Sequence, residues 1–282
     1  LFKGILGYTR AEFDTAMVTK SLGLSAVGGY NMMKNLSLMP AHDIVMPATQ
    51  PLLSSFSKVK DDTAKLSYQI SLSLTIICIL VLPISFFIAF NASLIVEVLL
   101  GRKWLEFTFI LQVMSVLLVT FSFAVVLHHA LTSVEKVKWL FFYDLFSMIF
   151  IIGSLLMISF ENINEFALAR CLLGVVSMVI FTVITLLFFK INILKLAFML
   201  LPVLASCLLA GFLSSKVNLL LTNYLYISFI VSPITFGVVY LVCISITFGF
   251  MRDIEEISQI RSLAFSVINK VKAKFPTKPL KF

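Results

Sequence analysis

The stretch GGYNMMKNLSLMPAHDIVMPATQPLLSS, which runs from Gly28 to Ser55, combines charged residues, prolines and apolar residues. The other long segments of the chain largely exclude polar side chains. Pro40, Pro47 and Pro51 are spaced seven and four residues apart. They therefore lie close to one face of a helix, and the backbone hydrogen bonds that proline removes are lost on that face. We predict a broken membrane helix in which these prolines form a kink that acts as a gate.

Lys34, His42 and Asp43 lie in the same stretch. Ionisable side chains inside membrane segments usually mark substrate or ion pathways. Irregular backbone at membrane depth is tolerated only where it is buried in protein or lines a water-filled cavity. We therefore expect this stretch to line a cavity that the other helices enclose.

The composition is that of a membrane protein. Hydrophobic residues make up 60% of the chain, charged residues only 13%, and the mean hydropathy is +1.05. These values are far too apolar for an ordinary soluble domain and indicate an all-α, polytopic membrane protein. The net charge of +8 comes from basic residues that are scattered between apolar runs or follow Phe250. This distribution argues against nucleic acid as a partner.

The sequence offers no pattern typical of catalysis. It shows no Ser/His/Asp arrangement, no metal-ligand spacing and no glycine-rich phosphate loop. The four cysteines stand singly within apolar runs and have no nearby histidine, so we interpret them as core or lipid-facing residues. We expect a transporter rather than an enzyme, with no catalytic residue, metal site or cofactor.

Apolar runs predict about eight membrane spans. The clearest is Leu66–Phe90, a run of 25 residues without charge. Such a run can cross a hydrocarbon core of about 30 Å at about 1.5 Å per residue. The expected spans are residues 11–24, the broken helix up to Lys58, and residues 66–90, 107–134, 139–160, 166–189, 196–215 and about 223–250.

The basic residues predict an orientation for these spans. If the first span begins in the cytoplasm, 16 of the 22 Lys and Arg residues fall on the cytoplasmic side. This arrangement follows the positive-inside rule and places both ends of the chain in the cytoplasm. The chain opens at Leu1 without a complete first helix or a signal peptide, so we expect an amino-terminal truncation.

Several motifs resemble the second half of the Wzx-type polysaccharide flippases of bacteria. The motifs are Asp14 followed by SLGLSAVGGYNMMKNLSLMP, then IVMPATQPLLSSF and LLGRKW. The resemblance covers roughly residues 7–104. The matching positions are Asp14, Gly23, Gly29, Tyr30, Pro47, Ser54 or Ser55, Gly101 and Trp104. These flippases export lipid-linked O-antigen and exopolysaccharide repeat units, and their superfamily includes the MATE drug exporters and the lipid II flippase.

The resemblance implies a protein of about 14 helices, with two six-helix lobes and two terminal helices. Residues 1–190 would then form the second lobe, residues 191–250 the two terminal helices, and residues 251–282 a basic cytoplasmic tail. The implied function is the movement of undecaprenyl pyrophosphate-linked oligosaccharides across the bacterial cytoplasmic membrane. The implied partners are this lipid-linked oligosaccharide, membrane lipids, a coupling ion, either proton or sodium, and the polysaccharide assembly machinery.

An anionic headgroup requires a cationic, hydrated cavity. Lys34 and Lys20 are the cations of the first two spans, and His42 shares a helix face with Lys34 at a spacing of eight. We expect these three residues to bind substrate, whereas the alternative for Lys34 is snorkelling to the headgroup region. A MATE-type antiporter of cations or drugs, which would favour acidic and aromatic residues over Lys34, is the alternative function.

Asp14 and Asp43 are the candidates for ion coupling. The family position favours Asp14, although an ordinary ion pair with Arg10, four residues away, is an equal alternative. Asp43 could instead be paired with Lys34 or His42 in the bundle interior. We expect Asp144 and Arg170 to pair at the membrane interface, because each lies about one turn inside its span. We also place His128 and His129 at the interface.

Overall fold

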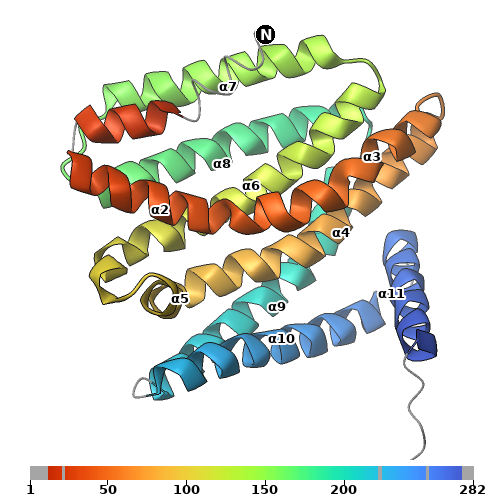
Figure 1. The fold of residues 1–282 in the computed structure, drawn as a ribbon. Coiled ribbons are helices and arrows are strands. Elements are labelled where there is room, and N and C mark those ends of the chain that lie inside the picture. Colours follow the sequence, from red (N-terminus) through yellow and green to blue (C-terminus); the bar gives the residue numbers. More distant parts are fainter. Residues whose placement is uncertain (1–11, 21–22, 222–223, 252–253, 275–282) are drawn as a thin grey trace, which may run out of the picture.

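The computed structural model describes residues 12–20, 23–221, 224–251 and 254–274. Over these residues the chain is helical throughout its regular structure and contains no strand (Figure 1). Residues 12–20 form the first helical segment. The elements that follow are α2 (Leu24–Pro40), η1 (Ala41–Val45), α3 (Met46–Lys58), α4 (Thr63–Phe90), α5 (Ala92–Leu99), η2 (Arg102–Phe107), α6 (Thr108–Ser133), α7 (Val137–Met157), α8 (Ile163–Phe188), α9 (Ile193–Leu220), α10 (Leu225–Phe250) and α11 (Glu255–Lys274).

Within the described ranges, six helical segments are long and apolar enough to cross a membrane. They are Thr63–Phe90, Arg102–Ser133, Val137–Met157, Ile163–Phe188, Ile193–Leu220 and Leu225–Phe250. Each overlaps one expected span, so the predicted all-α, polytopic membrane protein is confirmed. The other two expected spans are the helical residues 12–20, whose neighbours 21 and 22 lie outside the described residues, and the α2–η1–α3 segment.

The predicted break in the proline-rich stretch is a widened helical turn rather than unwound backbone. Residues Ala41–Val45 form a π-helix, in which the backbone N–H of Met46 donates to the carbonyl of Ala41. Pro47 follows directly, and a proline ring crowds the carbonyl four residues earlier in an α-helix. The wider turn relieves this conflict while it keeps the chain helical. As a result α2, η1 and α3 form one long, curved helical rod (Figure 1).

The π-turn also keeps one face of this rod against the bundle. Ser37, Ala41, Val45 and Thr49 are all buried and follow one another at intervals of four residues. In a regular α-helix, a spacing of four drifts around the axis by about 40° per step. A π-turn holds more residues per turn and absorbs part of this drift. The same face therefore packs on the bundle on both sides of the prolines.

Three of the helices begin at a polar cap. The side chains of Asp62, Asn162 and Asn192 each accept a hydrogen bond from the backbone N–H three residues later, at 3.0 Å. Each cap satisfies one of the backbone donors that a helix start leaves unpaired. The caps thus fix where α4, α8 and α9 begin.

The loops that carry the basic residues gather at one end of the bundle, called here the basic end. Lys60, between α3 and α4, lies 2.9 Å from the carboxylate of Glu135, between α6 and α7. The Ser67 hydroxyl of α4 donates to the backbone carbonyl of Phe189, beside the turn into α9. These contacts involve the α3–α4, α6–α7 and α8–α9 loops, three loops that the charge distribution predicts to lie on one side of the membrane.

Helix α11 lies across the basic end, at a steep angle to the long helices (Figure 1). Its first turn is anchored by Glu256, whose carboxylate lies 2.7 Å from the ammonium group of Lys195. Ile257 is fully buried against α4, α9 and α10 residues of the apolar core. The described part of the expected basic tail is therefore a helix packed on the bundle.

Gly29, one of the residues that carry the family resemblance, marks a close approach between elements. A β-carbon at this position would lie 2.3 Å from the ring of Phe107 at the end of η2. The adjacent Gly28 is exposed, and a β-carbon there would meet nothing within 4 Å. Gly29 thus lets the end of η2 pack on α2.

This contrast predicts opposite effects for two neighbouring substitutions. Gly29→Ala should lower the free energy of unfolding by about 1–3 kcal/mol, because the added methyl group displaces the Phe107 ring. Gly28→Ala should raise it by about 0.5–1 kcal/mol, because alanine is the better helix former and has room. Equilibrium unfolding of the purified proteins in mixed micelles measures both values. Equal effects of the two substitutions would contradict the close packing.

Candidate functional site: a charged cavity within the bundle

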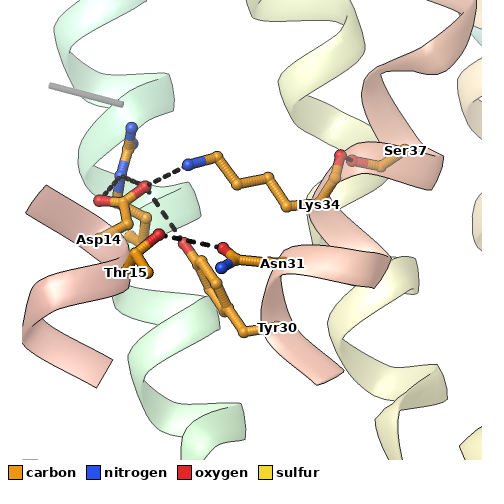
Figure 2. A network of polar contacts seen from close by, with 7 residues as sticks. Asp14, Thr15, Tyr30, Asn31, Lys34 and Ser37 are labelled. Atoms are coloured by element: carbon orange, nitrogen blue, oxygen red, sulfur yellow. Dashed lines mark hydrogen bonds and ion pairs between the residues drawn. The ribbon is translucent and has the colours of Figure 1, made fainter. Parts of the chain in front are cut away.

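A carboxylate shared by two cations lies at the centre of the most buried polar network. Arg170 donates from Nε to both carboxylate oxygens of Asp14, at 2.9 and 3.1 Å. Lys34 donates from Nζ to Asp14 Oδ2 at 3.1 Å, and the Tyr30 hydroxyl donates to the same oxygen at 3.3 Å. Figure 2 shows Lys34 and Tyr30 reaching from α2 toward the carboxylate of Asp14. The network therefore joins residues 12–20, α2 and α8.

Local helical geometry explains how these groups converge. Tyr30 and Lys34 are four residues apart on α2 and point from the same face. Gly174 lies one turn after Arg170 on α8, and a β-carbon there would come within 3.3 Å of Arg170 Nη1. The glycine therefore leaves room for the guanidinium group to turn toward Asp14.

The charged side chains of this network are buried deeply enough that they must be paired with one another. Asp14 is 2% exposed and Arg170 is 8% exposed. An isolated charge at such a depth would cost many kcal/mol, whereas a charge that is paired and hydrogen-bonded is tolerated. Two cations share one carboxylate, so the network carries an excess of one positive charge. Lys34, with 18% of its side chain exposed, is the more accessible of the two cations.

The exposed side of this network opens into a cavity of about 420 Å³. Its walls come from α2, η1, α6, α7 and α8. Apolar and hydroxyl side chains form most of the lining. The ionisable side chains in its walls are those of Lys34, His42, His128, Asp144 and Arg170, together with the Tyr143 phenol. A cavity of this composition can hold water and attract an anionic group.

A second pair of ionisable side chains lies in the same cavity, between α6 and α7. His128 Nε2 is 3.8 Å from Asp144 Oδ1, and both side chains are largely buried. The His128 ring also packs edge-to-face on Phe181 of α8, with ring centroids 5.5 Å apart. His42 packs against Phe121 at 5.6 Å on another wall.

The structure brings some of the predicted site residues together and separates others. Lys34 and His42 line one cavity, in agreement with their predicted shared face. Lys20 is exposed and is not among the residues of the cavity wall. Asp43 is also exposed, and it forms no ion pair with another residue in the described part of the chain. Lys34 pairs with Asp14 rather than with Asp43.

The three prolines of the predicted gate flank the π-turn. Pro40 is half-buried and immediately precedes the turn, whereas Pro47 and Pro51 are exposed on α3. Their gating role stays a prediction. The alternative pairing of Asp14 with Arg10 falls on a residue outside the described part of the chain.

Arg170, His128 and Asp144 are site residues that the sequence analysis did not assign to the cavity. The structure pairs Arg170, which is buried, with Asp14 from 156 residues away, and its expected place at the membrane interface stays a prediction. One sequence signal could have located it. A single arginine within an apolar run requires a buried counter-charge. Asp14 is one of the few carboxylates that the sequence places within an expected span.

Among the residues that the structure describes, no three His, Cys, Asp or Glu side chains are grouped so that they could hold a metal ion. The ionisable groups of the cavity are instead cations, two imidazoles and paired carboxylates. Their chemistry suits the binding of an anion and the transfer of protons.

The helix arrangement defines a multi-pass, all-helical membrane protein with a charged cavity inside the bundle. The solved structure of the lipid II flippase MurJ in its inward closed conformation is similar, with a TM-score of 0.68 and 15% sequence identity. The match covers 88% of this chain and 52% of MurJ. At this level of identity the likeness establishes the fold alone.

Sequence comparison then identifies the family to which the first part of the chain is similar. Residues 1–109 match the family model described as polysaccharide biosynthesis protein. The lipopolysaccharide biosynthesis protein WzxC of Escherichia coli K12 is 27% identical over 112 residues, and an uncharacterized membrane protein in the cps region of Klebsiella pneumoniae is 30% identical over 112 residues. Each alignment covers 40% of this chain and 23% of the relative. These matches confirm the resemblance to Wzx-type flippases.

The pairing of Asp14 with two cations predicts how its substitution changes stability. Asp14→Asn should lower the free energy of unfolding by about 3–5 kcal/mol, because it leaves two buried cations without their counter-charge. Glu97→Gln is the matched control, since it removes the partner of the largely exposed Arg102 and should change stability by less than about 1 kcal/mol. Unfolding of the purified variants in mixed micelles measures the difference. A similar, small effect of both substitutions would contradict the central role of Asp14.

Proposed function

We propose that this chain is part of a flippase that moves undecaprenyl pyrophosphate-linked oligosaccharide repeat units across the bacterial cytoplasmic membrane. The observation that carries the proposal is the cavity of about 420 Å³ with Lys34 and Arg170 in its wall. Both cations are held inside an apolar helical bundle. A lipid-linked diphosphate sugar has an anionic headgroup and a polar glycan, so it requires such a cationic, hydrated space within the membrane.

The similarity to known proteins supports this proposal in addition to the cavity. One relative is named for lipopolysaccharide biosynthesis, and the similar solved structure is named as a lipid II flippase. This chain spans about half the length of MurJ and aligns with about a quarter of each curated relative. In the proposal residues 1–190 form the second lobe, residues 191–250 the two terminal helices and residues 251–282 the cytoplasmic tail. The polysaccharide assembly machinery would be a partner.

Lys34 is the residue we assign to the substrate diphosphate. It is the more exposed of the two cations on Asp14, and it also lines the cavity. A phosphate oxygen can replace Asp14 as its acceptor, because ammonium groups bind phosphates and carboxylates through the same charge-assisted hydrogen bonds. Arg170 holds Asp14 through two hydrogen bonds and keeps the carboxylate compensated during this exchange. Substrate binding would thereby loosen α2 from residues 12–20.

The proposed transport cycle is alternating access driven by a coupling ion, either proton or sodium. Asp14 and Asp43 are the proposed coupling residues, and the π-turn with its flanking prolines is the proposed gate. Loosening of α2 would act directly on this rod, because η1 and α3 continue it. His42 lies in the π-turn and lines the cavity, so movement of the gate would move a substrate-facing side chain. Lys20, exposed on its helix, would act at the cavity entrance.

A genetic test addresses the function and the site together. The complete gene product is expressed in a strain that lacks its own O-antigen flippase, and surface glycan is measured. Lys34→Ala should reduce the glycan at least tenfold, because the headgroup loses its accessible cation. Lys34→Arg should restore a substantial part, because it keeps the charge. Lys103→Ala is the matched control, since Lys103 is exposed beside Trp104 and should leave the glycan unchanged.

Each outcome of this test has a defined meaning. Restored glycan that does not depend on Lys34 would keep the function and reject the assigned headgroup site. Absence of glycan despite confirmed membrane insertion, combined with growth protection under drug challenge, would favour the MATE-type antiporter. Lys34 and Arg170 in the cavity wall disfavour that alternative, because they would repel a cationic drug that approached them.

Ion coupling predicts that the rate of flipping in reconstituted vesicles depends on an ion gradient. Flipping of a labelled lipid-linked saccharide should fall several-fold when ionophores collapse both the proton and the sodium gradient. Each charge that moves through about 100 mV supplies about 2.3 kcal/mol to the cycle. Ionophores that collapse only one gradient identify the ion. Flipping at an unchanged rate in the absence of both gradients would remove the coupled mechanism.

A further inference from the structure

His128 and Asp144 form a pair in the cavity wall that the function proposed above does not use. His128 Nε2 and Asp144 Oδ1 are 3.8 Å apart across the contact between α6 and α7. Both side chains face the same cavity as Lys34 and Arg170. The pair therefore belongs to the space in which a headgroup would bind, but it lies outside the network centred on Asp14.

Aromatic contacts hold this pair in place. The His128 ring packs edge-to-face on Phe181 of α8, and the Tyr143 ring stacks on the same phenylalanine, with centroids 4.0 Å apart. The Tyr143 hydroxyl donates to the backbone carbonyl of Ser177 at 3.1 Å. Tyr143 directly precedes Asp144 on α7, so these contacts fix the carboxylate relative to the imidazole. These contacts pack α6, α7 and α8 against one another around the His128–Asp144 pair.

The elements around α6 bring several other ionisable groups into the cavity. Helix α2 contributes Lys34, η1 contributes His42, α7 contributes Asp144 and the Tyr143 phenol, and α8 contributes Arg170. Among the described residues of the wall, α4 contributes no ionisable side chain. With both histidines neutral, the carboxylates of Asp14 and Asp144 balance the charges of Lys34 and Arg170. One proton on His128 therefore makes this group of side chains net positive.

We propose that His128, positioned by Asp144, takes up a proton together with the anionic headgroup of the lipid-linked substrate. This inference rests on the proposed function, because it assumes that the headgroup enters the cavity. Free histidine changes its charge near neutral pH, and here the Asp144 carboxylate faces the His128 ring at 3.8 Å. An anion in the cavity favours the charged form of the imidazole, so proton and anion strengthen each other's binding. This linkage concerns the binding step and is separate from the ion exchange proposed for Asp14 and Asp43.

Other groups of the cavity fit this role less well. Asp14 already accepts hydrogen bonds from Arg170 and Lys34, and the proposed function assigns it to the separate ion exchange. His42 is an exposed residue of the π-turn and forms no ion pair with a carboxylate among the described residues. His129 is the neighbour of His128 but is not part of the cavity wall. It therefore offers a matched control.

The test measures the affinity of farnesyl diphosphate for the purified complete protein in nanodiscs of uncharged lipid, as a function of pH. Each variant is compared with the wild type at the same pH, so the ionisation of the probe itself cancels. The wild type should bind about tenfold more tightly than His128→Gln near pH 5.5, and the two should agree within about twofold near pH 8. His129→Gln should follow the wild type throughout.

Asp144→Asn provides a second, independent variant. It removes the carboxylate that favours the charged imidazole, so the pH dependence should remain but its midpoint should move to lower pH. This variant also keeps the proposal testable if His128→Gln fails to fold. His42→Gln should leave the midpoint where it is in the wild type. A midpoint that follows His42, or an unchanged midpoint in Asp144→Asn, would overturn the assignment to His128.

The outcomes separate this inference from the function on which it rests. A constant ratio between wild type and His128→Gln at all pH values, with binding that still requires Lys34, would overturn the proton site alone. Farnesyl diphosphate binding that is equally strong in Lys34→Ala and wild type at every pH would remove the headgroup site and both proposals with it.

Discussion

The carboxylate of Asp14 is the constraint on which the cavity depends. It is buried at a depth where a charge must be paired, and its two partners come from α2 and α8. Residues 12–20, α2 and α8 are therefore held around one group, although Asp14 and Arg170 are 156 residues apart in sequence. Lys34, the more exposed of the two cations, lies in the wall of the cavity. The interaction that closes the bundle thus also places a cation at the cavity.

The rod formed by α2, η1 and α3 connects this network to the basic end. Lys34 lies in its first half, the π-turn lies at its middle, and the turn with Lys60 follows its last residue. A wider turn keeps the buried face of the rod continuous across the prolines, but it leaves the local hydrogen bonding less regular than in an α-helix. A change in the partner of Lys34 can therefore reach the other end of the bundle along one continuous element. We regard this rod as the mechanical element of the proposed flippase.

The cavity contains two kinds of charged groups with different physical roles. Lys34, Arg170 and Asp14 form an ion-paired network that holds residues 12–20, α2 and α8 together. His128 and Asp144 form a pair whose charge depends on pH, held by aromatic contacts between α6, α7 and α8. We propose that the first group accepts an anionic headgroup and that the second adjusts how strongly the headgroup binds. The separation allows headgroup recognition and proton uptake to be tested by different substitutions.

The sequence by itself determined the class of the protein. Long apolar runs leave helices as the way to satisfy the backbone in a membrane, so six spans could be located from hydropathy alone. The residues around Gly29 and Tyr30 carried the family resemblance, and the helical period placed Lys34 and His42 on one face. Only the tertiary structure decided which charges meet. Local periodicity contains no information about partners on distant helices, so the burial of Arg170 against Asp14, the His128–Asp144 pair and the exposure of Lys20 and Asp43 follow from helix packing alone.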